Sequence, residues 1–160
     1  MSDTEQITAV LVRYATGIDS RDWALFRTCF TEDCRLDYGP LGSWDSRESV
    51  TRFMELSHSG PSLHRLSNFA ITVEGGQARS RCYVDAVVYG PGGWGGARAI
   101  GYYDDVLVAG NEGWQIARRR HTGVSMRFLG VLGIIPSGIA SRLAAMGSRR
   151  FNALALHSKR

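Results

Sequence analysis

The hydrophobic periodicity of this chain changes once, at the breaker SHSGPS of residues 57–62, and this change limits the folds open to it. Before the breaker, apolar residues recur every three or four positions, which predicts amphipathic helices. After it, long runs rich in β-branched and aromatic residues alternate with short glycine-containing turns, which predicts antiparallel strands. Helices segregated from strands in this way indicate an α+β domain.

The periodic segments give the expected bounds of each element. Three helices are expected at 4–17, 21–30 and 45–56. One short strand is expected at 34–38, and four longer strands at 63–73, 77–90, 97–109 and 114–130. A curved antiparallel sheet wrapped around three N-terminal helices can leave a cone-shaped cavity, and a small-molecule site would lie in such a cavity.

The length of 160 residues suits a single domain, which we place at residues 1–128. Residues 129–160 form an apolar and basic tail with three possible roles: a helix that closes the pocket, a subunit contact, or a membrane-surface segment, in that order of preference. No stretch of about 18 apolar residues occurs, so we expect no integral membrane association.

The charge distribution is asymmetric. Residues 1–112 carry 15 acidic and 10 basic side chains, whereas residues 113–160 carry 9 basic and no acidic ones. A basic end can indicate a nucleic-acid partner. Here 18 of the 19 basic residues are arginines scattered among apolar residues, without an aromatic RNA-binding pattern or a recognition helix. We therefore expect no nucleic-acid partner.

Cysteine and histidine spacing argues against a metal centre. The three cysteines, Cys29, Cys34 and Cys82, are odd in number and form no C-x-x-C motif, which is typical of buried thiols in a reducing compartment. The four histidines have no metal-ligand spacing. The N-terminus shows no cationic stretch followed by an apolar run. The expectation is a cytoplasmic protein without a metal.

His64 is the central catalytic candidate. An imidazole with a pKa of about 6.5 in water can act first as a base and then as an acid near neutral pH. Elimination of water needs both roles, because a carbon-bound proton is removed and the leaving hydroxyl is protonated. The alternative is a histidine that is hydrogen-bonded in the core or at a strand end.

Two strands carry further candidates. Asp85 interrupts an apolar strand, and a carboxylate facing a cavity is costly unless it is paired. A solvent-facing Asp85 is nearly as well supported. In the last strand, strict alternation puts Trp114 on one face with Arg118 and Arg120, so either arginine could hold an anionic substrate group. The same alternation puts His121 on the other face.

Five segments together resemble the SnoaL-like branch of the NTF2-like superfamily, especially scytalone dehydratase and bile-acid dehydratase. They are YATGIDSRDWALF at 14–26, RLDYG at 35–39, LHRLSN at 63–68, YYDDVLV at 102–108 and EGWQIARRR at 112–120. The resemblance implies a cone-like α+β barrel with one pocket per subunit, no metal, no organic cofactor, and assembly into dimers or trimers.

The resemblance also implies residue roles. His64 matches the histidine that moves both protons in these dehydratases, and Asp19 is either its hydrogen-bonding partner or a cap for the second helix. The separation of Tyr14 from Asp19 matches the bile-acid branch, and Tyr38 matches a tyrosine that polarises the substrate carbonyl; core packing is the alternative for both tyrosines. Asn68 and Tyr103 also fall in matched segments, and the bile-acid branch has a site aspartate near the position of Asp85. Of these, Tyr103 departs from the pattern, because scytalone dehydratase has a site asparagine there.

The function expected on this basis is that of a cofactor-independent lyase, a dehydratase. Its substrate would be a hydrophobic cyclic hydroxy ketone of steroid-like or polyketide-like shape. A ketosteroid-type isomerase or a polyketide cyclase with the same Asp–His pair is a close alternative. Two alternatives come from other classes: a non-catalytic small-molecule-binding protein, and an assembly domain whose open sheet face pairs with another subunit.

Overall fold

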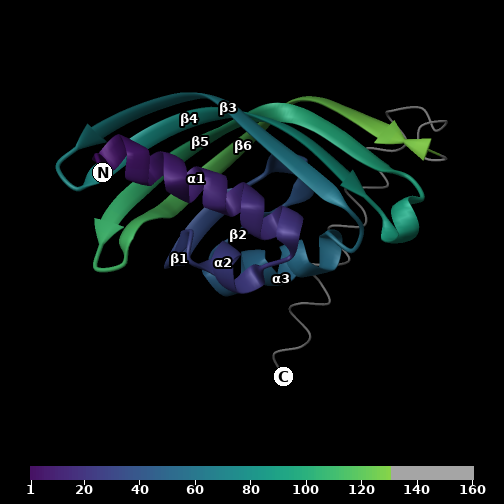
Figure 1. Ribbon diagram of the computed structural model, residues 1–160, viewed down its shortest axis with the longest axis horizontal. Coiled ribbons are helices and arrows are strands. Elements are labelled where there is room, and N and C mark those ends of the chain that lie inside the picture. Colours follow the sequence, from purple (N-terminus) through teal and green to yellow (C-terminus); the bar gives the residue numbers. More distant parts are fainter. Residues whose placement is uncertain (131–160) are drawn as a thin grey trace.

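The computed structural model describes residues 1–130, in which three helices lie against one face of a single curved sheet (Figure 1). The helices are α1 (Asp3–Ser20), α2 (Trp23–Arg27) and α3 (Arg47–Ser57). The strands are β1 (Phe30–Asp37), β2 (Ser43–Trp44), β3 (Ser62–Glu74), β4 (Gln77–Tyr89), β5 (Gly96–Gly110) and β6 (Gly113–Leu129). The predicted α+β fold of N-terminal helices and a curved sheet is confirmed.

The six strands are ordered β2-β1-β6-β5-β4-β3. All neighbours pair antiparallel except β1 and β6, which are parallel, so the expected purely antiparallel sheet needs this one correction. The parallel pair arises because β6 returns to the β1 edge of the sheet in the same direction as β1. The two edge strands, β2 and β3, do not pair with each other, and the sheet is therefore open.

Helix α1 begins with a capping box. The Ser2 Oγ accepts a hydrogen bond from the Glu5 backbone N–H at 3.3 Å, and the Glu5 carboxylate accepts one from the Ser2 N–H at 2.7 Å. Ser2 therefore caps this helix, which begins at Asp3, one residue before the expected start. The apolar stripe of α1 is buried against the sheet: Ile7, Val10, Leu11, Tyr14 and Ile18.

Alternation along the strands divides the sheet into an inner face, covered by the helices, and an outer face. In β4, for example, alternate residues from Ala78 to Ala86 are buried, and those between them point outward. Three one-residue bulges interrupt this pattern in the long strands. One follows Ser67 in β3, and the other two lie in β6, at Ala117 and at Val124. Each bulge inserts an extra residue and so reverses which side chains face inward beyond it.

Residues 131–160 lie outside the part that the structure describes, and the predicted lid or subunit-contact role of the tail falls almost entirely on them. Within residues 1–130, no helix is long and apolar enough to cross a membrane. The three cysteines are buried and free.

Candidate active site

Asp19 and His64 lie in direct contact although 45 residues separate them in the sequence. Asp19 is near the end of α1, and His64 is the third residue of β3, the strand against which α1 packs (Figure 1). The His64 Nδ1 is 2.7 Å from the Asp19 Oδ1, and the His64 backbone N–H donates to the Asp19 Oδ2 at 2.7 Å. The exposed fraction is 6% for the His64 side chain and 19% for that of Asp19. The alternative role of Asp19 as a helix cap is filled by Asp22, whose carboxylate accepts from the Leu25 N–H.

The charge state of Asp19 determines which nitrogen of His64 carries the proton. Burial by itself raises the pKa of Asp19, but hydrogen bonds from the His64 ring and backbone and from Ser62 outweigh it and hold the pKa below its ordinary value. Asp19 is therefore a carboxylate near neutral pH and can only accept hydrogen bonds. The proton of neutral His64 must lie on Nδ1, which leaves the Nε2 lone pair available as a base.

This lowered pKa predicts an acid-sensitive contribution to stability. A carboxyl group whose pKa is depressed on folding stabilises the native state above its unfolded pKa of about 3.9, and the contribution is lost as pH falls through the folded value. Urea unfolding between about pH 6 and pH 2 should therefore show a smaller fall in unfolding free energy for Asp19→Asn than for the unmodified chain. An Asp45→Asn control, at an exposed position, should retain the full fall. Equal falls for Asp19→Asn and the unmodified chain would contradict the lowered pKa.

Three tyrosine hydroxyl groups meet in the interior. The Tyr14 and Tyr38 hydroxyl oxygens are 2.8 Å apart, and those of Tyr14 and Tyr103 are 3.5 Å apart. The His121 ring lies 5.4 Å from both the Tyr38 and Tyr103 rings, measured between centroids. Burial raises the pKa of Tyr14, Tyr38 and Tyr103, so these hydroxyls stay protonated and can donate hydrogen bonds. Tyr14 and Asp19 are five residues apart on α1, which separates them by about 7.5 Å along its axis and about 140° around it.

A buried ion pair packs against this tyrosine cluster. The Arg119 Nε and Nη2 donate to the two oxygens of Asp105 at 2.7 and 2.8 Å, and both side chains have an exposed fraction of 0%. The Arg119 guanidinium lies 4.1 Å from the ring centres of Tyr14 and Tyr103. Burial by itself lowers the pKa of Arg119, but Asp105 outweighs this and keeps the arginine a cation. The Arg119 Nη1 is buried with no hydrogen-bond partner among the described residues.

Arg119 and the inward position of His121 were not predictable from the sequence. Strict alternation from Trp114 would place Arg119 and His121 on the other face, but the bulge at Ala117 shifts the pattern by one residue. Arg118 and Arg120 consequently lie on the outer face, where Arg120 is exposed and 3.7 Å from Asp37. No local sequence signal marks the bulge, because Ala117 suits a regular strand as well as a bulged one.

Two other predicted site residues lie away from the Asp19–His64 pair. Asp85 lies on the outer face, where the Arg98 guanidinium donates to its carboxylate at 2.8 and 2.7 Å. Neighbouring residues of a strand point to opposite faces. Because Ala86 is buried on the inner face, Asp85 points outward. Asn68 is exposed at the β3 bulge with a φ of 53°, a left-handed conformation that asparagine tolerates. Asn68 thus occupies the bulge of β3.

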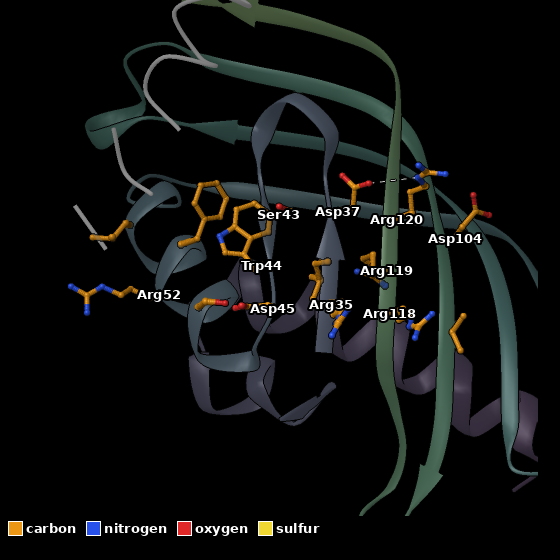
Figure 2. Close-up of a pocket in the computed structure, with 15 residues that line it drawn as sticks. Arg35, Asp37, Ser43, Trp44, Asp45, Arg52, Asp104, Arg118, Arg119 and Arg120 are labelled. Carbon is orange, nitrogen blue, oxygen red and sulfur yellow. Dashed lines mark ion pairs between the residues drawn. The ribbon is translucent and has the colours of Figure 1, made fainter. Parts of the chain in front are cut away.

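A hollow of about 1120 Å³ opens between the β1–β2 hairpin, α3 and β6 (Figure 2). In this view Arg35 and Arg118 project side by side from neighbouring strands, and Arg52 points away from them. Neither Asp19 nor His64 lines this hollow, so it is separate from the candidate catalytic pair. Within residues 1–130, no group of three histidine, cysteine or acidic side chains is arranged to hold a metal ion.

Comparisons with known proteins give a matching family model and a related sequence. Residues 1–120 match the family model described as a SnoaL-like domain. An uncharacterised protein of Mycobacterium tuberculosis is 32% identical over 130 residues, which cover 76% of this chain and 86% of the relative.

Two solved structures have similar folds. A protein of Novosphingobium aromaticivorans, provisionally named a scytalone dehydratase, gives a TM-score of 0.69 at 22% identity over 82% of this chain and 93% of its own. A type 2 hexachlorocyclohexane dehydrochlorinase gives a TM-score of 0.71 at 12% identity over 84% of this chain and 93% of its own. At these identities the two likenesses establish a shared fold.

Proposed function

This chain belongs to the SnoaL-like domain family of the NTF2-like superfamily, and from that premise we propose that it is a cofactor-independent dehydratase. Its substrate is a hydrophobic cyclic hydroxy ketone. The observation that carries the proposal is the 2.7 Å contact between the Asp19 carboxylate and the Nδ1 of a His64 side chain that is 6% exposed. A buried carboxylate–imidazole pair with a free Nε2 is suited to moving protons, whereas a protein that only binds ligands has no need of one.

The proposed reaction uses His64 twice. Its Nε2 removes a proton from the carbon next to the substrate carbonyl, and the electrons of the broken C–H bond form an enolate. The resulting imidazolium, stabilised by Asp19, then donates the same proton to the hydroxyl group on the neighbouring carbon. The C–O bond breaks, a C=C bond forms in conjugation with the carbonyl, and one water molecule leaves.

The tyrosine cluster is the proposed stabiliser of the enolate. Neutral phenols can donate hydrogen bonds to a developing oxyanion without carrying a charge themselves. Tyr14 and Tyr38 have protonated hydroxyls 2.8 Å apart, and the fixed positive charge of Arg119 lies against the Tyr14 ring. A carbonyl oxygen that displaced the Tyr14–Tyr38 hydrogen bond could receive a hydrogen bond from each of them.

The names of the two structural neighbours support elimination chemistry, because both a dehydratase and a dehydrochlorinase remove a small molecule from their substrates. An isomerase or a cyclase would use the same pair for its first step, since both also begin by removing a proton beside a carbonyl. The product therefore has to distinguish the three reactions.

The test is a product assay on cyclic hydroxy ketones of steroid and aromatic polyketide shape. We expect a product lighter than the substrate by one water, with a new absorbance from the conjugated enone, detected by mass spectrometry and ultraviolet spectroscopy. An isomer of unchanged mass would favour the isomerase or the cyclase. Tight binding without hydrogen exchange into deuterated solvent or product formation would overturn the catalytic proposal in favour of a binding protein.

A further inference from the structure

A chain of hydrogen bonds continues from Asp19 away from His64. The Ser62 Oγ is 2.8 Å from the Asp19 Oδ1, and the Arg21 Nη1 is 2.9 Å from the Ser62 Oγ. A guanidinium can only donate hydrogen bonds, so the Ser62 oxygen accepts from Arg21 and its own hydrogen is directed to Asp19. The donor order is therefore fixed along the whole chain, from Arg21 through Ser62 to the carboxylate.

We propose that Arg21 is a positioning residue that acts through Ser62 to hold the Asp19 carboxylate and, with it, the Nδ1–H tautomer of His64. The catalytic meaning of this tautomer rests on the function proposed above. Three donors converge on the carboxylate: the Ser62 hydroxyl, the His64 Nδ1–H and the His64 backbone N–H. Removal of the Ser62 hydroxyl would free the Asp19 carboxylate to rotate about its Cβ–Cγ bond.

The backbone at Arg21 directs its side chain toward β3. Arg21 is the C-terminal cap of α1 and has a left-handed φ of 61°, where glycine is the usual residue. Such a conformation is strained for a residue with a Cβ. Its guanidinium bridges the end of α1 to the start of β3 by donating to the carbonyl oxygens of Ile18 and Gly60 as well as to Ser62.

Gly60 supplies a fixed anchor for this guanidinium. A Cβ at position 60 would overlap the carbonyl oxygens of Tyr89 and Gly90, so only glycine lets the chain pass this close to the end of β4. The Pro61 carbonyl that follows accepts from the Tyr89 N–H at 2.9 Å, which holds the segment against β4. Arg21 therefore donates to a carbonyl whose position the sheet determines.

The left-handed φ of Arg21 also makes glycine a suitable substitution for testing this role. Arg21→Gly removes the guanidinium and relieves the backbone strain, so loss of fold is not expected to obscure the result. Ser62→Ala interrupts the same chain at its second member without touching residue 21. Arg65→Ala is the matched control, because Arg65 is exposed on the outer face beside His64.

The experiment measures the tautomer of His64 in the full chain labelled with ¹⁵N-histidine, near neutral pH and without substrate. Long-range ¹H–¹⁵N correlation spectra distinguish a protonated from an unprotonated ring nitrogen. We expect Nδ1–H in the unmodified chain and in Arg65→Ala. In Arg21→Gly and Ser62→Ala the minor Nε2–H population should rise about tenfold, corresponding to the loss of one charge-assisted hydrogen bond.

An unchanged Nδ1–H tautomer in both variants would overturn the positioning role of Arg21, as would Nε2–H in the unmodified chain. Circular dichroism and the signals of His58 and His121 report whether the fold is intact in each variant. Because no substrate is present, the result is independent of the product assay. Failure of the proposed reaction leaves the tautomer result standing, and failure of the tautomer test leaves the reaction standing.

Discussion

Replacement of His64 by alanine is expected to lower the kcat of the dehydration by about 10²–10⁴-fold, the range that a positioned acid–base group contributes. Both proton transfers are assigned to the Nε2 of this one ring, and among the described residues no other histidine is hydrogen-bonded to Asp19. The measurement is steady-state turnover on the substrate found in the product assay. The KM should change little, because His64 acts on the proton rather than on the apolar body of the substrate.

Replacement of Asp19 by asparagine should lower the kcat by a similar factor. Both carboxylate oxygens accept hydrogen bonds, Oδ1 from the His64 ring and from Ser62, and Oδ2 from the His64 backbone. An asparagine amide has only one oxygen, so its NH₂ group must face one of these donors. If it faces the ring, the tautomer that leaves Nε2 free is no longer favoured.

Asp85→Asn is the matched control for this substitution. It makes the same chemical change at a carboxylate that pairs with Arg98 on the outer face. We expect turnover close to that of the unmodified chain. A loss at Asp85 as large as that at Asp19 would mean that the site extends to the outer face, and normal turnover in both His64→Ala and Asp19→Asn would refute the pair as the catalytic centre.

Asp105→Asn is expected to be the most destabilising of the charge-removing substitutions, by about 3–5 kcal/mol in unfolding free energy. It leaves the Arg119 guanidinium, which has an exposed fraction of 0%, without its counter-ion. The neighbouring Asp104 is the matched control. It forms an equivalent two-point contact with Arg81 on the outer face, where water can replace the lost partner.

Urea denaturation of the two asparagine variants measures this difference. Asp104→Asn should leave the unfolding free energy almost unchanged. The double variant Asp105→Leu, Arg119→Met should regain much of the lost stability, because two apolar side chains replace the buried ion pair without leaving an isolated charge. Equal effects at Asp104 and Asp105 would show that the inner ion pair is accessible to water in solution.

The local sequence determined most of the secondary structure of this protein. The switch from helical to strand periodicity predicted the three helices and the long strands, and the ends differ by a few residues because capping depends on side chains such as Ser2 and Asp22. Asp19 and His64 were also identifiable, since each belongs to a segment that resembles a known family. Their hydrogen bonds to Ser62 and Arg21 were not, because these contacts form only where the end of α1 meets the start of β3.

The amino-acid sequence by itself thus determined the order of the helices and long strands and pointed to Asp19 and His64 as candidates. It did not predict the short strand β2, and the tertiary structure decided which residues of β6 face the interior. A strand has a period of two, so one extra residue at Ala117 exchanges the inner and outer faces of the residues between it and the second bulge at Val124. That single shift buries Arg119 against Asp105, turns His121 toward the tyrosines and leaves Arg120 on the outer face. The bulge lies where β6 is held between β5 and β1, and β1 is distant in sequence, so residues near Ala117 carry no local signal of it.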